Sequence, residues 1–377
     1  MIYYLICFSS SLFLFWFGQK LKHGQYEPFR WFVYGIALLI PATLAGVRDW
    51  TIGTDVLVYG YPIFSEARIV PDIKSFSFIY DGWIGTGYLW LNFLIGKTTD
   101  NLNILLFVLM LIEITFVFFA VYQWRDKFPI WIGMLVFYAF FFNLSFNAMR
   151  QCLALSIAFV GIKYLFERKF LFFTLWVVLG SLFHISAIII LLYYPLFWCA
   201  NKYTSKKSTL LFSVALVLLI VFSNQILIPL SYFISNIIPR AYIIAEYLAY
   251  IDKDGSGYKN FMYFGLLVVL FLYKKDTILK NFPKTGHFLK IAIIITVIAQ
   301  LTTFAAGEHA LRFIIISNWW LYFLIPIIFY SYLKMFPRSV VNLAITVYCF
   351  FYWYYIFIHL GFSETKNYSS SILSSIF

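Results

Sequence analysis

Apolar runs alternate with short polar segments along the whole chain. A helix needs about 20 apolar residues to cross the ~30 Å hydrocarbon core of a bilayer. A transmembrane β-barrel would instead alternate apolar and polar positions over about 10 residues, and this alternation is absent. The pattern therefore predicts an all-α polytopic membrane protein. The candidate spans are residues 2–17, 31–46, 103–122, 129–146, 150–166, 170–198, 209–228, 261–274, 287–304, 311–332 and 339–358.

These spans predict about 11–13 transmembrane helices in a single integral membrane domain, residues 1–377. The longest polar connections fall at about 47–102 and 229–260, and both are expected on the outer side. The composition agrees, because 63% of residues are hydrophobic and 12% are charged. A soluble domain would have about 45–50% apolar and about 25% charged residues.

The formal net charge of +12 does not indicate a nucleic-acid partner. In a membrane protein, excess Lys and Arg gather in cytoplasmic loops. The four cysteines are scattered through apolar segments without a CxxC pair or a nearby histidine cluster, so we expect no metal or redox cofactor.

The positive charges also predict an orientation. Lys20, Lys22 and Arg30 follow the first span, which places the N-terminus outside. The later basic clusters stay on the cytoplasmic side only if two apolar segments do not each form a single transmembrane helix. Gly87 to Gly96 would dip into the membrane, and Phe170 to Trp198 would form a helical hairpin with His184 near its tip.

With this topology, the polar residues that interrupt apolar sequence all come to the outer side. We therefore expect the chemistry to face the periplasm or the cell exterior. These residues are Arg48, Asp55, Asn147, Arg150, His184, Arg240, Glu308, His309 and Arg312.

The segment "GVRDWTIGTD" places an arginine and a carboxylate where a helix leaves the membrane. Arg48 beside Asp55 is a candidate anion site. The alternative is that Arg48 marks the boundary and Asp55 caps the next helix. That helix is expected to be short and interfacial, because Val56, Tyr59 and Ile63 share one face.

The segment "FNAMRQ" opens a helix and puts Arg150 on its first turn. Cations prefer helix C-termini, so this position is electrostatically unusual. Free N–H groups, a guanidinium and the neighbouring Asn147 and Gln151 would together suit an anionic ligand such as phosphate. The alternative is an arginine that snorkels to the interface.

Two further segments carry titratable groups. His184 in "GSLFHISA" is a candidate base or phosphate donor if it meets Arg150, and otherwise a hydrogen-bonded core histidine. Glu308, His309 and Arg312 lie within one helical turn, where Glu308 and Arg312 could also form a simple ion pair. Arg240 lies in a tyrosine-rich outer segment whose rings could stack on sugars.

Four of these segments together resemble a known family. They are "GVRDWTIGTDVLVY", "NAMRQCLALSIAFVGIKYLFERK", "LFHISAIIIL" and "LRFIIISNWWLYFLIP", and they occur in the order seen in EpsG-like exopolysaccharide polymerases. These proteins are similar to the Wzy-type O-antigen polymerases of bacterial inner membranes. The resemblance covers roughly residues 1–335.

The resemblance implies a metal-independent glycosyltransferase with a GT-C-like helical bundle. Such enzymes join oligosaccharide repeat units carried on undecaprenyl diphosphate at the periplasmic face, often beside a chain-length co-polymerase. Arg48, Arg150 and Arg312 would bind diphosphate, assisted by Asn147, Gln151, Arg240 and His309. The base would be Asp55, His184 or Glu308. Relatives often carry a glutamate before a Gly-aromatic pair, whereas the nearest acid to Gly87 here is Asp81.

Other functions share parts of this pattern. A lipid-linked oligosaccharide flippase would also need arginines for diphosphate, but along a cavity that spans both leaflets. Another polyprenyl-phosphate-dependent glycosyltransferase or ligase would use the same lipid carrier. A membrane O-acyltransferase would need a histidine reached from the cytoplasm, whereas His184 and His309 are expected outside. No Gly-rich phosphate loop, HExxH or GxSxG motif supports nucleotide-driven transport or metalloprotease chemistry.

Overall fold

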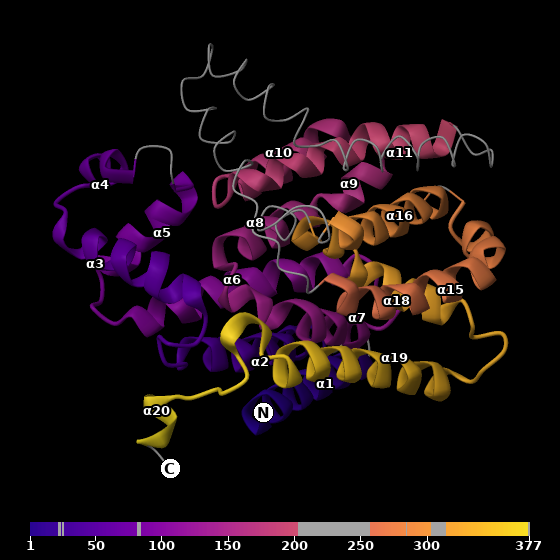
Figure 1. Ribbon diagram of the computed structural model, residues 1–377, viewed down its shortest axis with the longest axis horizontal. Coiled ribbons are helices and arrows are strands. Elements are labelled where there is room, and N and C mark those ends of the chain that lie inside the picture. Colours follow the sequence, from indigo (N-terminus) through magenta and orange to yellow (C-terminus); the bar gives the residue numbers. More distant parts are fainter. Residues whose placement is uncertain are drawn as a thin grey trace. The chain divides into compact units, whose positions relative to one another are not determined.

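The structure is a computed structural model that describes residues 1–21, 24, 26–80, 84–202, 257–283, 285–302 and 314–375 (Figure 1). All regular elements within these ranges are helical. Five helical segments are long and apolar enough to cross a membrane, namely Ile2–Lys20, Glu27–Gly46, Leu102–Tyr122, Ile185–Lys202 and Arg338–His359. Shorter apolar helices accompany them. The predicted all-α polytopic membrane fold is confirmed.

The described helices fall into two compact units, Met1–Leu191 with Ile325–Phe377 and Leu192–Leu324. In the second unit, α11 (Tyr193–Lys202) packs on α16 (Gly286–Thr302), and α15 (Gly257–Asn281) packs on α16. All of the described candidate residues belong to the first unit.

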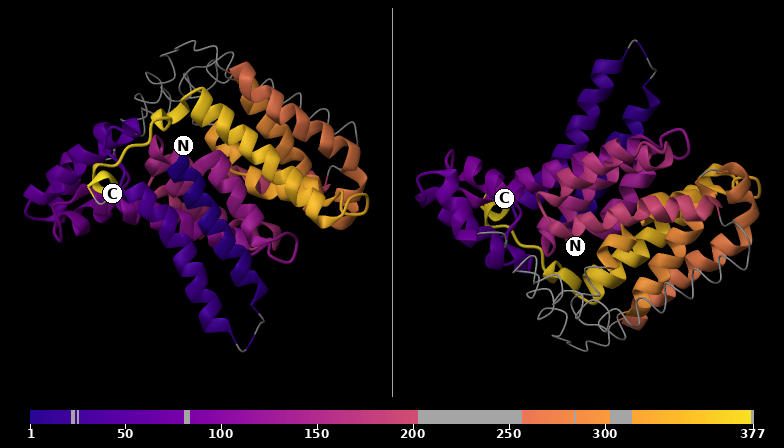
Figure 2. Two further views of the ribbon diagram at one scale, coloured as in Figure 1. Left: turned by 90° about the horizontal axis from the view of Figure 1, so that it is seen from below. Right: turned by 90° about the horizontal axis from the view of Figure 1, so that it is seen from above.

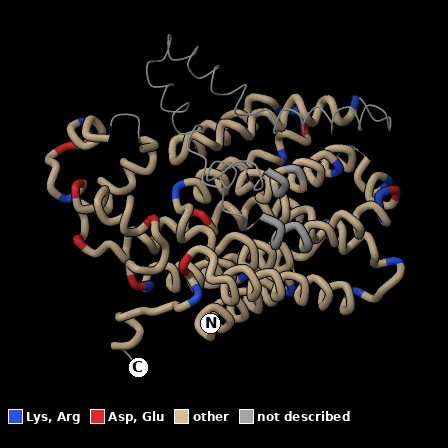
Figure 3. Tube along the Cα trace, in the orientation of Figure 1, with Lys and Arg blue, Asp and Glu red and all other residues tan. Residues whose placement is uncertain are grey.

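The first unit is a series of helices that each pack on the next. Figure 2 shows α1 and α2 side by side as an antiparallel pair. The tube in Figure 3 is uncharged along most of the length of the long helices, as lipid-facing and core surfaces require. The order of packing is α1 (Ile2–Lys20) on α2 (Glu27–Gly46), α2 on α6 (Leu102–Tyr122), α6 on α8 (Met149–Val160), and α8 on α10 (Phe170–Ser181).

Helices α8 and α10 approach closely because small residues line their contact. A Cβ atom added at Gly180 would lie 2.4 Å from the carbonyl oxygen of Ala154 and 3.2 Å from the Cβ of Ala158. Small residues let membrane helices pack backbone to backbone. The helices are antiparallel, since Gly161 at the other end of α8 meets Trp176. The start of α8 and the end of α10 therefore lie together.

The described residues between 56 and 96, which make up most of the first predicted outer loop, are mainly helical. They form η1 (Val56–Gly60, a π-helical turn), α3 (Tyr61–Ile69), α4 (Ile73–Tyr80) and α5 (Thr86–Gly96), which we call the outer helices. The predicted short helix with Val56, Tyr59 and Ile63 on one face is confirmed, because Val56 and Ile63 are buried and Tyr59 is half-buried.

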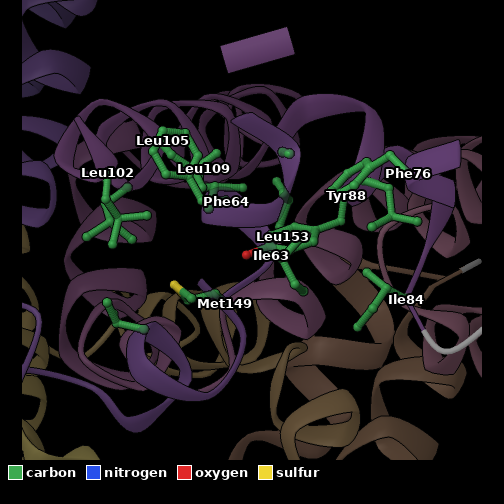
Figure 4. Packing of buried hydrophobic residues seen from close by; sticks show 14 of the residues in the cluster. Ile63, Phe64, Phe76, Ile84, Tyr88, Leu102, Leu105, Leu109, Met149 and Leu153 are labelled. Atoms are coloured by element: carbon green, nitrogen blue, oxygen red, sulfur yellow. The ribbon is translucent and has the colours of Figure 1, made fainter. Parts of the chain in front are cut away.

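The outer helices are held by an apolar cluster that they share with α6 and α8 (Figure 4). Each buried side chain of this size contributes about 1.5–3 kcal/mol. The cluster thus fixes the outer helices against the membrane-spanning ones. Its labelled members are Ile63, Phe64, Phe76, Ile84, Tyr88, Leu102, Leu105, Leu109, Met149 and Leu153.

The remaining described elements of the first unit complete its core. The chain passes from α7 (Ile130–Phe137) through η2 (Tyr138–Phe142) and η3 (Leu144–Phe146) into α8, and α9 (Ile162–Phe166) follows. Residues 182–184 break the helix before η4 (Ile185–Leu192), so His184 lies at the predicted break. The C-terminal elements are α18 (Leu321–Tyr330), of which residues 325–330 belong to this unit, α19 (Arg338–Trp353), η6 (Tyr354–His359), η7 (Phe362–Glu364) and α20 (Ser371–Ser374).

Replacing Gly180 with Leu should separate α8 from α10, because the new side chain meets a backbone carbonyl that cannot move aside. We expect a loss of at least about 1–3 kcal/mol of stability, seen as a lower apparent melting temperature in detergent. Gly35→Leu in α2 is the matched control, since nothing lies within 4 Å of a Cβ added there. Equal melting temperatures for the two variants would contradict the close packing.

Candidate functional site

Two hydrogen bonds fasten the loop after α2 to the start of α8. The backbone N–H of Thr54 donates to Oδ1 of Asn147 at 2.6 Å, and the N–H of Met149 donates to Oδ2 of Asp55 at 3.2 Å. The Asp55 carboxylate thus satisfies one of the free N–H groups at the N-terminus of α8 and complements its partial positive charge. We call residues 48–55 the clamp loop.

The prediction that Asp55 caps the helix that follows it is wrong. Asp55 does stand at the start of η1, but its side chain makes no capping hydrogen bond there. Its carboxylate is taken by a helix 94 residues further along the chain. Asp55 therefore joins two elements of the fold instead of ending one.

Arg48 lies inside the clamp loop and is only 2% exposed. Its Nη1 donates to the carbonyl oxygen of Ala45 at 2.6 Å, and its Nε donates to that of Ile52 at 3.2 Å. Its guanidinium carbon lies 4.1 Å from the centroid of the Phe146 ring. Gly53 has a φ of +89° and a backbone pressed against the Phe146 carbonyl, where a Cβ would lie 2.4 Å from the oxygen. Arg48 therefore fixes the shape of the loop from within.

The side chain of Glu113, buried in α6, attracts this arginine from beyond ion-pair distance. Glu113 in α6 is 2% exposed and accepts a hydrogen bond from Oγ of Ser145 at 2.5 Å. Both Glu113 and Asp55 attract the Arg48 guanidinium. Burial lowers the pKa of Arg48 to about 10, so it remains protonated at neutral pH.

Glu113 was not predicted from the sequence, although a signal was present. It is the one acid in the apolar segment Leu102–Tyr122, and an ionisable residue within a membrane span is by default a candidate functional group. The sequence patterns used for prediction select polar residues near the outer ends of helices, and Glu113 lies in the middle of a helix.

Arg150 lies on the first turn of α8, as predicted, and is half-buried. Its guanidinium carbon lies 4.2 Å from the centroid of the Tyr59 ring and 5.9 Å from that of Tyr88. Tyr59 comes from η1 and Tyr88 from α5, so the outer helices orient this arginine. Among the residues that the structure describes, Arg150 forms no ion pair, and its contacts are aromatic.

The neighbours of Arg150 have different surroundings. Asn147 is half-buried, and its amide oxygen accepts the hydrogen bond from Thr54. Gln151 is 4% exposed. Of the three predicted polar groups at the start of α8, Arg150 is therefore the one with both partial exposure and no described polar partner.

His184 lies at the same end of the α8–α10 pair as Arg150. The segment before it docks on the start of α5, where the N–H of Gly87 donates to the carbonyl oxygen of Leu182 at 2.8 Å. Gly85 makes this approach possible, since a Cβ there would lie 2.3 Å from the same oxygen. Phe183 packs against the apolar cluster that contains Tyr88. The residues just before His184 thus pack against α5, which also contacts Arg150 through Tyr88.

The hydrogen bonds of His184 assign its tautomer. Its Nδ1 accepts a hydrogen bond from the backbone N–H of Ser186 at 3.3 Å and lies 2.7 Å from Oγ of Ser186. An accepting Nδ1 carries no proton, so in the neutral ring the proton is on Nε2. The neutral imidazole can therefore donate from Nε2.

The C-terminal segment 361–375, the C-terminal strap, crosses the clamp loop. Oγ of Thr54 donates to Oε2 of Glu364 at 3.0 Å, and the hydroxyl of Tyr368 donates to the carbonyl oxygen of Leu44 at 2.7 Å. Asp49 accepts from both the N–H and the Oγ of Ser371 at 2.8 Å. These hydrogen bonds hold the pKa of Asp49 below its ordinary value.

The other predicted site residues lie outside the described residues. They are Arg240, Glu308, His309 and Arg312, together with Asp81, the acid nearest to Gly87. Within the described ranges, no group of three or more His, Cys, Asp or Glu side chains could hold a metal ion.

The coupling between Arg48 and Glu113 can be measured with a double-mutant cycle. Arg48→Met leaves the carbonyl oxygens of Ala45 and Ile52 without their buried donor and should cost about 1–3 kcal/mol for each of them. Combined with Glu113→Gln, the loss should differ from the sum of the two single losses by a small coupling, near the lower end of about 0.5–3 kcal/mol, because the two side chains attract without forming an ion pair. Arg68→Met, which removes an arginine that is 44% exposed, should change stability little. Strictly additive losses at Arg48 and Glu113 would contradict the coupling.

A comparison with known families identifies the family of the chain. Residues 31–370 match the profile described as the EpsG family, which covers most of the chain and includes the clamp loop, α8 and the His184 segment. No match was found among curated proteins or among solved structures. The family predicted from the sequence is thereby confirmed, and membership supports a general role of exopolysaccharide-polymerase type. The chain belongs to the EpsG family.

Proposed function

We propose that this protein elongates a bacterial surface polysaccharide by joining oligosaccharide repeat units carried on undecaprenyl diphosphate. In each step, an acceptor hydroxyl attacks the anomeric carbon that bears the diphosphate of the growing chain. The new glycosidic bond forms, the carbon–oxygen bond to diphosphate breaks, and undecaprenyl diphosphate leaves with the electron pair. The hydroxyl proton passes to a base. Membership of the EpsG family supports this reaction class.

The observation that carries the proposal is the placement of Arg150. It is half-buried on the first turn of α8, stacked on Tyr59, and it forms no ion pair among the described residues. A guanidinium offers a rigid fork of donors that fits phosphate oxygens, and stacking on an aromatic ring leaves these in-plane donors available. A positive group in such a site can stabilise the charge that develops on the diphosphate leaving group.

The clamp loop gives Arg48, Asp55 and Asn147 a positioning role in this proposal. Arg48 ties the loop to the end of α2, because it donates to the carbonyl oxygens of Ala45 in α2 and Ile52 in the loop. Asp55 and Asn147 accept backbone N–H groups across the contact with α8. These contacts hold the first turn of α8, and therefore Arg150, against Tyr59. Arg48 then acts on the diphosphate through Arg150 and not by contact.

His184 is assigned as a donor to a phosphate or sugar oxygen, because its neutral ring carries the proton on Nε2. The sequence suggested three candidate bases, namely Asp55, His184 and Glu308. In this proposal the carboxylate of Asp55 is occupied by α8, and His184 serves as a hydrogen-bond donor. Glu308 is therefore our proposed base, and Arg240, His309 and Arg312 are proposed further contacts to the diphosphates. Gln151 is buried, so we propose that it helps to position Arg150 and does not contact the substrate.

The remaining proposals concern the setting of the reaction. We place the protein in the inner membrane with Arg150 facing the periplasm or exterior, because the basic connections between spans then lie inside. The lipid-linked repeat units and the surrounding lipids are its partners, and a chain-length co-polymerase is a further expected partner. The reaction is proposed to need no metal.

The proposal predicts a specific change in surface polysaccharide when Arg150 is replaced. Cells lacking the gene, or carrying Arg150→Ala, should lose the long-chain ladder on a polysaccharide gel and keep a band of one repeat unit. Arg68→Ala should restore the ladder, since this exposed arginine of α3 contacts neither Tyr59 nor the clamp loop. Loss of the single-repeat band in the deletion would instead indicate a flippase or an earlier step. A normal ladder with Arg150→Ala would remove Arg150 from the site.

Asp55 can be tested separately as a positioning residue. Asp55→Asn keeps a side-chain oxygen that accepts from Met149, so we expect most of the polymer to remain. Asp55→Ala removes that acceptor, costs about 0.5–2 kcal/mol of stability, and should shorten the polymer. If Asp55 were instead the base, both variants would abolish polymerisation equally, at unchanged protein levels.

A further inference from the structure

A polar cavity lies at the other end of the first unit, where α1 ends and α2 begins. Its volume is about 150 Å³. A water molecule in the liquid has a share of about 30 Å³, so the cavity has room for a group of several heavy atoms, such as a phosphate. The side chains that line it include Gln19, Arg30, Tyr34, Tyr122, Arg125 and Asp126.

The cavity is distinct from the candidate site around Arg150. The clamp loop follows the C-terminal end of α2, whereas Arg30 and Tyr34 lie near its N-terminal end. A helix of 20 residues is about 30 Å long, which is the thickness of the hydrocarbon core. The cavity and the candidate site therefore lie at opposite ends of α2, about one hydrocarbon thickness apart.

Two arginines supply the cavity with guanidinium donors. Arg30 is 4% exposed and pairs with Glu27 through Nη2, and Arg125 is exposed with its guanidinium carbon 4.2 Å from the centroid of the Tyr122 ring. Asp126 also lines the cavity, but it is exposed on a turn where water screens its charge. Arg125 is equally exposed, and Glu27 offsets the charge of Arg30, so the cavity offers directed guanidinium N–H donors with little net positive charge.

Aromatic rings frame the cavity at the depth where lipid headgroups lie. Trp31 is 5.3 Å from Tyr122 and 5.9 Å from Tyr34 between ring centroids. Phe32 on the same helix is 63% exposed, which is expected of a lipid-facing side chain. Trp and Tyr gather at membrane interfaces because one end of the ring is apolar and the other is polar. The cavity is therefore placed where a lipid phosphate could reach it.

We propose that this cavity binds a phosphate anion, with Arg30 and Arg125 as its principal contacts. Gln19, Tyr34 and Tyr122 provide further polar atoms around it. Basic pockets between membrane helices on the cytoplasmic side are known to bind anionic headgroups. The phosphate belongs either to an anionic phospholipid or to a soluble phosphate, and both present the same anion to the arginines. This proposal does not depend on the polymerase reaction.

The test uses the full-length protein in lipid nanodiscs and compares spin-labelled phosphatidylglycerol with spin-labelled phosphatidylcholine. We expect the protein to bind phosphatidylglycerol preferentially, and Arg125→Gln to weaken that preference by about tenfold, since a charged hydrogen bond is lost. Arg125 is exposed, so its replacement should leave the fold intact. Arg30→Gln should have the same effect in samples that remain monodisperse.

Lys163→Gln is the matched control. Lys163 is an exposed cation of α9 at the same end of the helices, and it lies outside the cavity. Inorganic phosphate provides the second arm of the test. If it raises the melting temperature of the wild type but not of Arg125→Gln, without any lipid preference, the ligand is a soluble phosphate. If neither lipid preference nor phosphate stabilisation occurs, or if Lys163→Gln reduces binding as much as Arg125→Gln, the proposal is wrong.

Discussion

The hydrogen bond from the N–H of Met149 to the carboxylate of Asp55 is the contact on which the candidate site depends. It joins the loop after α2 to the first turn of α8, and the bond between Thr54 and Asn147 reinforces it. Because α8 carries Arg150 on that turn, anything that moves the clamp loop also moves the arginine. The loop in turn is shaped by Arg48, which is buried and donates hydrogen bonds to the carbonyl oxygens of Ala45 and Ile52.

The outer helices also contribute to the position of Arg150. The apolar cluster beneath them fixes Tyr59 and Tyr88 next to the start of α8, and these rings set the direction of the Arg150 guanidinium. The close contact of α8 with α10 then brings the His184 segment to the same end. A site for lipid diphosphate can thus be built from membrane helices whose own packing is apolar, with few polar groups placed at their ends.

The local part of this arrangement was predictable from the sequence, and the long-range part was not. The face shared by Val56, Tyr59 and Ile63, the position of Arg150 on a first helical turn and the break at His184 all follow from short patterns. The partner of Asp55 lies 94 residues away, and a capping residue looks the same whether it serves its own helix or another. Arg48 ends an apolar run, but only packing reveals that it points inward. The C-terminal strap is short and has no helical or strand periodicity in its sequence. Its contacts with Asp49 and Thr54 could therefore not be predicted.

The central claim is that Arg150 stabilises the departing lipid diphosphate during chain extension. The most direct measurement is the release of undecaprenyl diphosphate by purified protein in liposomes supplied with one lipid-linked repeat unit. The account predicts one lipid diphosphate released for each glycosidic bond formed, and a rate about 10²–10³ times lower with Arg150→Ala at equal protein and substrate binding. An unchanged rate with Arg150→Ala, or chain extension without release of the lipid diphosphate, would contradict it.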